Sequence, residues 1–272
     1  MRRAPTTASP SRAEMASAAR SAAEEFIALA LSAPDPETPV PATPGWSVTD
    51  VLGHVSAEPA RYHELAHGRG RWPAQVADLP AFNAEQVSTL PTRAPAELAA
   101  RLRDGLDAFL ETIEGFGDDQ PLMDFDGDQR VRVDRSLGTL IGEFVVHGHD
   151  LARALGRPRR IRPELVPMVL LGQHQVMPGW VDRDRTAGHT ATYEFRLRGQ
   201  ETHVYEFHNG HLTVDPPRPG RIDVRISADP VTALLLNYGR IRPWPATLTG
   251  KLTAWGRRPW LAAGLVTRFL PP

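Results

Sequence analysis

The chain has 272 residues, with 31 Lys+Arg, 32 Asp+Glu, ten His and no Cys. At roughly 100–200 residues per domain, this length suits one large domain or two ordinary ones. The formal net charge of -1 excludes a general attraction to nucleic acid or to an anionic membrane. The absence of cysteine excludes disulfides, thiolate zinc sites, iron–sulfur clusters and a cysteine nucleophile.

The scarcity of lysine and the lack of a P-loop exclude further classes of catalytic site. Lys251 is the only lysine, so a Schiff base could form at that position alone, and the Gly-Lys-Ser/Thr ending of a P-loop never occurs. Any sulfur chemistry would need a thiol supplied by a small molecule. No apolar run approaches the ~18 residues of a membrane span, and residues 1–10 are typical of a disordered tail. We therefore expect a cytoplasmic protein that partners neither membrane nor nucleic acid.

The first half is predicted to be helical, with a short strand pair before its last helix. Ser47 is a predicted N-cap with Asp50 three residues on, and Trp46 is placed as a hydrophobic staple. Four principal helices, each with one apolar stripe, favour a bundle. The predicted helices are 11–33, 47–67, 82–90, 95–116 and 137–155, and the strand pair falls within 129–134.

The pattern changes near residue 160, where alternating segments with turn residues between them follow one more helix. We predict an α+β protein overall: a tail over 1–10, a helical bundle over 11–160 and a small α+β domain over 161–272. In this second domain the predicted helices are 163–176, 230–238 and 258–269, and the predicted strands are 190–197, 202–207, 211–214, 221–226 and 246–254.

Candidate metal ligands fall in the helix predicted over 137–155. At 100° per residue, Glu143 and His147 lie about 40° apart on one face, and Asp150 lies within about 20° of Glu143. His149 points about 120° away from Glu143. A carboxylate and an imidazole on consecutive turns can bind one divalent metal ion. The alternative is a buried histidine that a neighbouring carboxylate satisfies.

A third ligand must come from another helix, and His54 is the candidate. It follows Val51 and Leu52 in an apolar run, where a histidine is more often a hydrogen-bonded core residue, and Glu58 lies one turn further along its face. His63 and His67 lie about 180° and 220° around the helix from His54 and are expected on the surface. Two histidines and one carboxylate would leave coordination positions open, as in catalytic sites.

Two motifs together resemble the mycothiol-dependent maleylpyruvate isomerase family. They are residues 46–54 (WSVTDVLGH) and residues 143–158 (EFVVHGHDLARALGRP). That family resembles the DinB-like metalloenzymes, four-helix bundles that hold a divalent metal ion, usually zinc, by His, Glu and His. The resemblance covers about residues 11–160, and it implies that His54, Glu143 and His147 are the ligands here.

The second half is more weakly similar to the sterol-carrier-like C-terminal domain of the same family. The matching stretches are residues 226–240 (ISADPVTALLLNYGR) and 248–252 (LTGKL). One position departs from the family, since His149 stands where its pattern often has Trp. This leaves the ligands intact and puts the family's substrate in doubt.

The resemblance implies an enzyme that takes mycothiol, a cysteine-based sugar thiol of actinobacteria, as cosubstrate. Zinc would hold the sulfur as a thiolate. In an isomerisation the thiolate would add to a cis double bond, and its elimination after rotation about the carbon–carbon bond would give the trans product. In a transfer the sulfur would stay bonded to the electrophile. Arg240 is the candidate to bind a substrate carboxylate, although it could be an ordinary surface arginine. Asp150 and Glu58 are candidates to orient the ligands, and Asp150 could instead pair with Arg153.

Two alternatives stay open at this point, and the chain could be a monomer or a homodimer. The main one is a non-catalytic carrier of a small molecule or lipid with a pocket in the second domain. Trp244, Trp255 and Trp260 could line that pocket, although they are more simply core residues. A DNA-damage-associated binding protein rests on fold analogy alone and lacks a basic patch.

Overall fold

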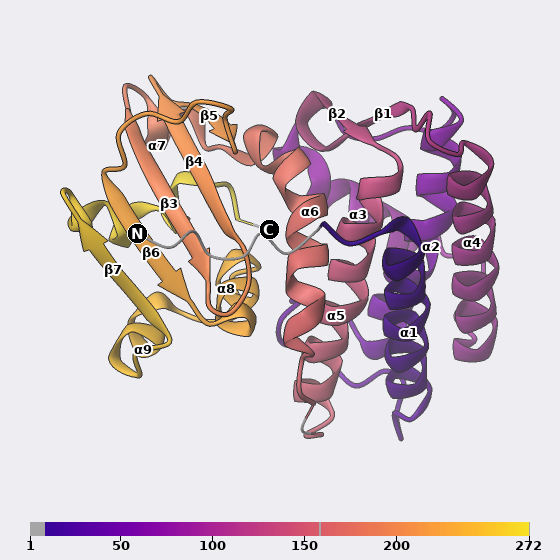
Figure 1. Cartoon of the computed structure of the whole chain (residues 1–272). Coiled ribbons are helices and arrows are strands. Elements are labelled where there is room, and N and C mark those ends of the chain that lie inside the picture. The colour runs from indigo at the N-terminus through magenta and orange to yellow at the C-terminus, as the bar shows by residue number, and fades with distance from the viewer. Residues whose placement is uncertain (1–8, 158, 272) are drawn as a thin grey trace. The chain divides into compact units, whose positions relative to one another are not determined.

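The computed structural model of the chain (Figure 1) describes residues 9–157 and 159–271. Residues 1–8, which hold most of the predicted tail, and Pro158, within the predicted boundary, lie outside the described residues. Contacts divide the described chain into two compact units: residues 10–161 with 168–175, and residues 162–167 with 176–271.

Among the described residues of the first unit, four long helices form a bundle. Helix α2 packs on α4, α1 packs on α5, and further contacts join α1 to α4 and α2 to α5 (Figure 1). Large apolar side chains from these helices, such as Phe26, Phe109 and Phe144, are fully buried between them. The helices are α1 (Arg12–Leu31), α2 (Val48–Ala66), α4 (Pro95–Gly115) and α5 (Leu137–Ala154).

The start of α2 is fixed by the predicted cap. The Ser47 side chain accepts a hydrogen bond from the Asp50 backbone N–H, and the Asp50 carboxylate accepts one from the Ser47 N–H at 2.8 Å. Trp46, just before the cap, lies with its ring centroid 5.1 Å from that of His54. The cap therefore sets the register of α2 and with it the position of His54.

Shorter elements complete this unit. The strand pair was predicted within 129–134, but the structure forms it from β1 (Leu122–Phe125) and β2 (Gln129–Arg132), which are antiparallel. The acidic turn between them hid the first strand, because Asp124, Asp126 and Asp128 weaken any strand signal. Helix α3 is Leu79–Ser88, and 3₁₀ helices lie at Val76–Asp78, Asp126–Asp128 and Asp134–Ser136. Helix α6 (Val166–Val176) lies mostly in this unit, and the 3₁₀ helix Pro163–Leu165 before it belongs to the other.

Helices α5 and α6 approach closely at two glycines. A Cβ on Gly172 would lie 2.3 Å from the backbone N of Thr139, and a Cβ on Gly138 would lie 2.2 Å from the carbonyl oxygen of Met168. We expect Gly172→Ala to destabilise the protein by about 3 kcal/mol, because backbone must move apart. The melting temperature should fall by roughly 5–10 °C.

Gly115→Ala is the matched control, because a Cβ at this exposed helical residue meets nothing within 4 Å. Its melting temperature should equal or slightly exceed that of the wild type. A Gly172→Ala protein that melts with the wild type would show that the two helices can separate without cost.

The second unit contains a mixed sheet with the strand order β5-β4-β3-β6-β7. Strands β3 and β6 are parallel, and the other neighbours are antiparallel. Asn209 and Gly210 join β4 to β5 with φ of 49° and 85°, as a tight hairpin requires. The strands are β3 (Ala191–Leu197), β4 (Thr202–His208), β5 (His211–Val214), β6 (Val224–Ala228) and β7 (Leu252–Gly256), and the helices are α7 (Arg183–Thr186), α8 (Pro230–Asn237) and α9 (Pro243–Leu248).

The overall α+β class is confirmed, with helices first and the sheet after them, but two predicted segments near the end are wrong. The strand predicted over 246–254 is the end of α9 followed by β7, because Gly250 turns the chain with a φ of 68°. The helix predicted over 258–269 is replaced by two short 3₁₀ helices, Pro259–Gly264 and Val266–Arg268. Another 3₁₀ helix of this unit lies at Met177–Trp180. Proline at the start of that segment and Gly264 within it both weaken an α-helix.

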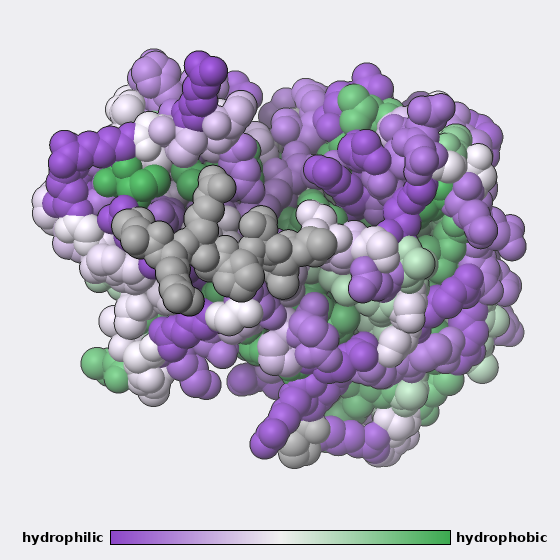
Figure 2. All heavy atoms as spheres, in the orientation of Figure 1, coloured by the Kyte–Doolittle hydropathy of each residue, from purple (hydrophilic) through white to green (hydrophobic). Residues whose placement is uncertain are grey.

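The surface of the described chain is mostly polar, and Figure 2 shows hydrophilic side chains over most of the visible face with small apolar areas between them. Trp244, Trp255 and Trp260 are 61%, 40% and 66% exposed, so the interpretation of these residues as core is wrong. Within residues 9–157 and 159–271, no helix combines the length and hydrophobicity that crossing a membrane requires.

Candidate metal centre

Three side chains from two helices of the bundle converge on one point. The Oε2 atom of Glu143 lies 3.2 Å from Nε2 of His147, on the same helix α5, and 3.7 Å from Nε2 of His54 on α2. The two imidazole centroids are 5.5 Å apart with the rings nearly perpendicular. One donor atom from each residue lies within 4.8 Å of the other two.

These distances fit a single small divalent cation. Two nitrogen or oxygen donors bound to one tetrahedral zinc ion at ~2.1 Å are about 3.4 Å apart, and the observed 3.2 and 3.7 Å lie on either side of that value. His54 and His147 are buried, while Glu143 is partly exposed. The arrangement can therefore hold a metal ion with three protein ligands and leave a further position open to a small molecule.

Each histidine turns its other nitrogen toward an oxygen acceptor. Nδ1 of His54 lies 2.8 Å from Oε1 of Gln86, and Nδ1 of His147 lies 3.6 Å from Oδ2 of Asp150. The first distance is a hydrogen bond and the second is only an ion-pair contact. A proton held on Nδ1 leaves the Nε2 lone pair for a metal ion, as metal-binding histidines usually require.

The charges of the site reinforce one another. Burial by itself raises the pKa of Glu143, but His147 and His54 outweigh it and hold the pKa well below the usual range of a glutamate. Burial lowers the pKa of His147, but Asp150 and Glu143 outweigh it and raise the pKa to about 9. Glu143 is thus a carboxylate at any physiological pH, in the charge state that a metal ligand needs. His147 carries a proton on both nitrogens at neutral pH in the metal-free site, so a metal ion that binds its Nε2 displaces one proton.

Glu58 connects the site to a partly buried arginine. Its Oε1 atom lies 3.8 Å from Nδ1 of His54 and 3.0 Å from Nη1 of Arg61, one turn further along α2. The Arg61 guanidinium lies 4.8 Å from the ring centroid of Trp72 and 4.7 Å from that of Phe82. The two rings hold the guanidinium in place, and Arg61 in turn pairs with the buried Glu58 beside His54.

Gln86 is the residue of this site that the sequence did not reveal. It lies on the short helix α3, 32 residues after His54, and no spacing in the sequence links the two. We expect Gln86→Ala to weaken zinc affinity by 10- to 100-fold, the usual effect of removing a partner that orients a ligand. Competition with a chromogenic chelator measures this affinity directly.

Glu85→Ala is the matched control, because Glu85 is an exposed neighbour on the same helix. Gln86→Glu should keep the affinity, since a carboxylate accepts the same hydrogen bond. Equal affinities for Gln86→Ala and Glu85→Ala would mean that Gln86 does not orient His54.

Arg240, the candidate to bind carboxylate, belongs to the other unit. It follows α8 and is partly exposed, and its guanidinium Nη1 donates a hydrogen bond to the carbonyl oxygen of Tyr238 at 2.7 Å. The Arg240 backbone N–H donates to the Leu235 carbonyl oxygen at 2.8 Å. These bonds hold the loop after α8 and the backbone of Arg240 in place.

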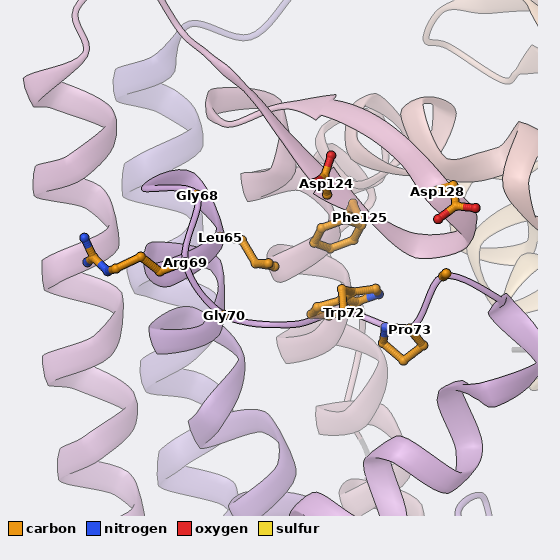
Figure 3. Close-up of a pocket in the computed structure, with 10 residues that line it drawn as sticks. Leu65, Gly68, Arg69, Gly70, Trp72, Pro73, Asp124, Phe125 and Asp128 are labelled. Atoms are coloured by element: carbon orange, nitrogen blue, oxygen red, sulfur yellow. The ribbon is translucent and has the colours of Figure 1, made fainter.

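A separate pocket of about 380 Å³ lies where α2 ends (Figure 3). Trp72 and Phe125 stack beside it with centroids 4.5 Å apart, and Asp124 and Asp128 extend from the β1–β2 hairpin. The Arg69 side chain points away from the ring pair in Figure 3 and binds Glu64 instead. None of the residues lining this pocket is a candidate metal ligand.

A family profile and two solved structures match this chain. The profile of the mycothiol maleylpyruvate isomerase N-terminal domain matches residues 7–152, a span that contains His54, Glu143 and His147. No curated protein matches the chain. Two solved structures, the mycothiol-dependent maleylpyruvate isomerase and a histidine-to-alanine mutant of it, each show 14% identity and a TM-score of 0.57 over 92% of this chain and 95% of theirs. At this identity they demonstrate a shared fold, and the profile match shows that this chain belongs to the mycothiol maleylpyruvate isomerase N-terminal domain family.

Proposed function

We propose that this protein is a zinc-dependent enzyme that uses mycothiol as a thiol cosubstrate. The observation that carries the proposal is the convergence of two Nε2 atoms and one carboxylate oxygen at the spacing of a tetrahedral ion. Imidazole and carboxylate donors suit zinc, and three protein ligands are typical of catalytic rather than structural zinc.

Zinc bound there would keep the mycothiol sulfur as a thiolate, a better nucleophile at neutral pH than the thiol. The protein itself contains no cysteine, so it has no thiol of its own to compete for the metal. Gln86 and Glu58 orient His54, and Asp150 does the same for His147. Arg240 binds a carboxylate of the substrate, because a guanidinium can hold both carboxylate oxygens at once.

The substrate that these residues favour is a small, acidic, unsaturated electrophile. Isomerisation returns the thiol after the double bond has rotated, whereas S-transfer leaves a thioether. The family's name points to maleylpyruvate, while His149 at the position where the family's pattern often has Trp favours a related but different acid.

The test is an assay of the zinc-loaded protein with maleylpyruvate and a panel of unsaturated acids, each with mycothiol, with cysteine and without thiol. Proton NMR separates a trans isomer from a thioether product. We expect turnover that depends on mycothiol. Turnover at the same rate without thiol would contradict the proposal.

The alternative of a small-molecule carrier makes a different prediction. The tryptophans suggested to line its pocket are exposed, which is the opposite of what a buried ligand cavity needs. Stoichiometric lipid in the purified protein, together with no thiol-dependent turnover, would favour the carrier.

A further inference from the structure

His63 and His67 form a second histidine pair on α2, outside the centre described above. They lie one turn apart near the end of the helix, and their ring centroids are 4.6 Å apart. Two imidazoles bound to one metal ion place their centroids about 5 Å apart, given zinc–nitrogen bonds of ~2.0–2.1 Å. The observed separation of the two rings is therefore close to that of two imidazoles on one cation.

The hydrogen bonds of both rings define which nitrogen carries the proton. Nδ1 of His67 lies 2.8 Å from the carbonyl oxygen of His63, which can only accept, so this Nδ1 is the donor. The Thr112 hydroxyl donates to the Ala108 carbonyl oxygen at 2.9 Å and must therefore accept from Nδ1 of His63, 2.8 Å away. In each neutral ring the free lone pair is on Nε2.

The surroundings of the pair suit a cation and leave it accessible. The His63 side chain is 29% exposed, and His67 is exposed. Oε1 of Glu64 lies 3.7 Å from Nε2 of His63, while two hydrogen bonds of 2.8 and 2.9 Å hold Glu64 on Arg69. One carboxylate thus lies beside the pair and attracts a positive ion there, and its ion pair with Arg69 offsets part of that attraction.

We propose that His63 and His67 form a second transition-metal site, for Zn²⁺, Ni²⁺ or Cu²⁺, that fills after the first. Imidazole donors favour these ions over Mg²⁺ and Ca²⁺. His63 is nine residues from His54 along α2, or roughly 13 Å at 1.5 Å per residue, so the two sites bind separate ions. With two protein ligands, this site binds more weakly than the first.

The test titrates Zn²⁺ by calorimetry into metal-free wild-type protein, so that both equivalents are followed in one experiment. We expect a second equivalent, at least about tenfold weaker than the first because one protein ligand is missing. His63→Ala and His67→Ala should each abolish the second equivalent and keep the first. Thr112→Val should weaken binding of the second equivalent several-fold, because it removes the hydroxyl that holds the proton on Nδ1 of His63. Thr112→Ser keeps that hydroxyl and should keep the affinity.

His208→Ala is the control, because His208 and His211 face each other across β4 and β5 as an exposed pair in the other unit. This variant should retain the second equivalent. The proposal would be overturned if His208→Ala lost the second equivalent of zinc, or if the wild type did not bind one. It would also be overturned if both His63→Ala and His67→Ala kept the second equivalent. Since the first equivalent is measured in the same titration, failure here leaves the proposed catalytic zinc site untouched.

Discussion

Replacement of His54, Glu143 or His147 by alanine is expected to remove the tightly bound metal ion and all mycothiol-dependent turnover. The wild type should hold close to one zinc per chain at this site, and each variant should hold much less, because two ligands seldom retain zinc against a chelator. Elemental analysis after dialysis against a weak chelator measures this content, and circular dichroism checks that each variant is folded.

His149→Ala is the control for these variants. His149 lies on the same helix α5, but it is not among the residues that converge on the site. Its zinc content should equal that of the wild type. A wild type that takes up no zinc when zinc is supplied would remove the basis of the proposed mechanism, and retention of zinc in all three ligand variants would place the metal elsewhere.

Arg240→Ala is expected to lower kcat/KM for an acidic substrate by about 100-fold, a loss of roughly 2.7 kcal/mol, as for removal of a charge-assisted hydrogen-bonding partner. Zinc content should not change, because Arg240 lies in the other unit and is not a ligand. Arg240→Lys should recover part of the activity, since lysine keeps the charge but not the paired donors. Steady-state kinetics on the substrate found in the panel assay measure both effects.

Arg242→Ala provides the matched control, as an exposed arginine two residues further along the same loop. It should have wild-type kcat/KM. If Arg242→Ala loses as much activity as Arg240→Ala, the effect is general electrostatics rather than a specific carboxylate contact. Wild-type kinetics for Arg240→Ala would remove this residue from the proposed site.

Local patterns accounted for the parts of the site that lie on one helix. The 3.6-residue period already placed Glu143, His147 and Asp150 on one face of α5, and the structure shows the corresponding contacts of 3.2 and 3.6 Å. His54 needed the family motif, since nothing in an apolar run distinguishes a ligand from a core histidine. Gln86 carried no signal, because its role depends on how α3 packs against α2.

The surface histidines show the same limit. The spacing of His63 and His67 predicted only two solvent-facing side chains. The hydrogen bond between His63 and Thr112 exists because α4 packs alongside α2, whereas the bond from His67 to the His63 carbonyl oxygen lies within the end of α2 itself. Together the two bonds leave the lone pair of each neutral ring on Nε2.

The sequence by itself determined the four long helices of the bundle, most strands of the larger sheet, the cap at Ser47, the family and the absence of cysteine chemistry, because each of these depends on residues close in the chain or on composition. It failed at 246–254 and 258–269, where proline and glycine interrupt weak local preferences. The tertiary structure alone decided that Nε2 of His54 faces the candidate metal centre and that its Nδ1 faces Gln86, because α5 and α3, both far from His54 in sequence, supply the two sides of its ring. It also decided the glycine contact between α5 and α6, where the fit of two backbones leaves no room for a side chain.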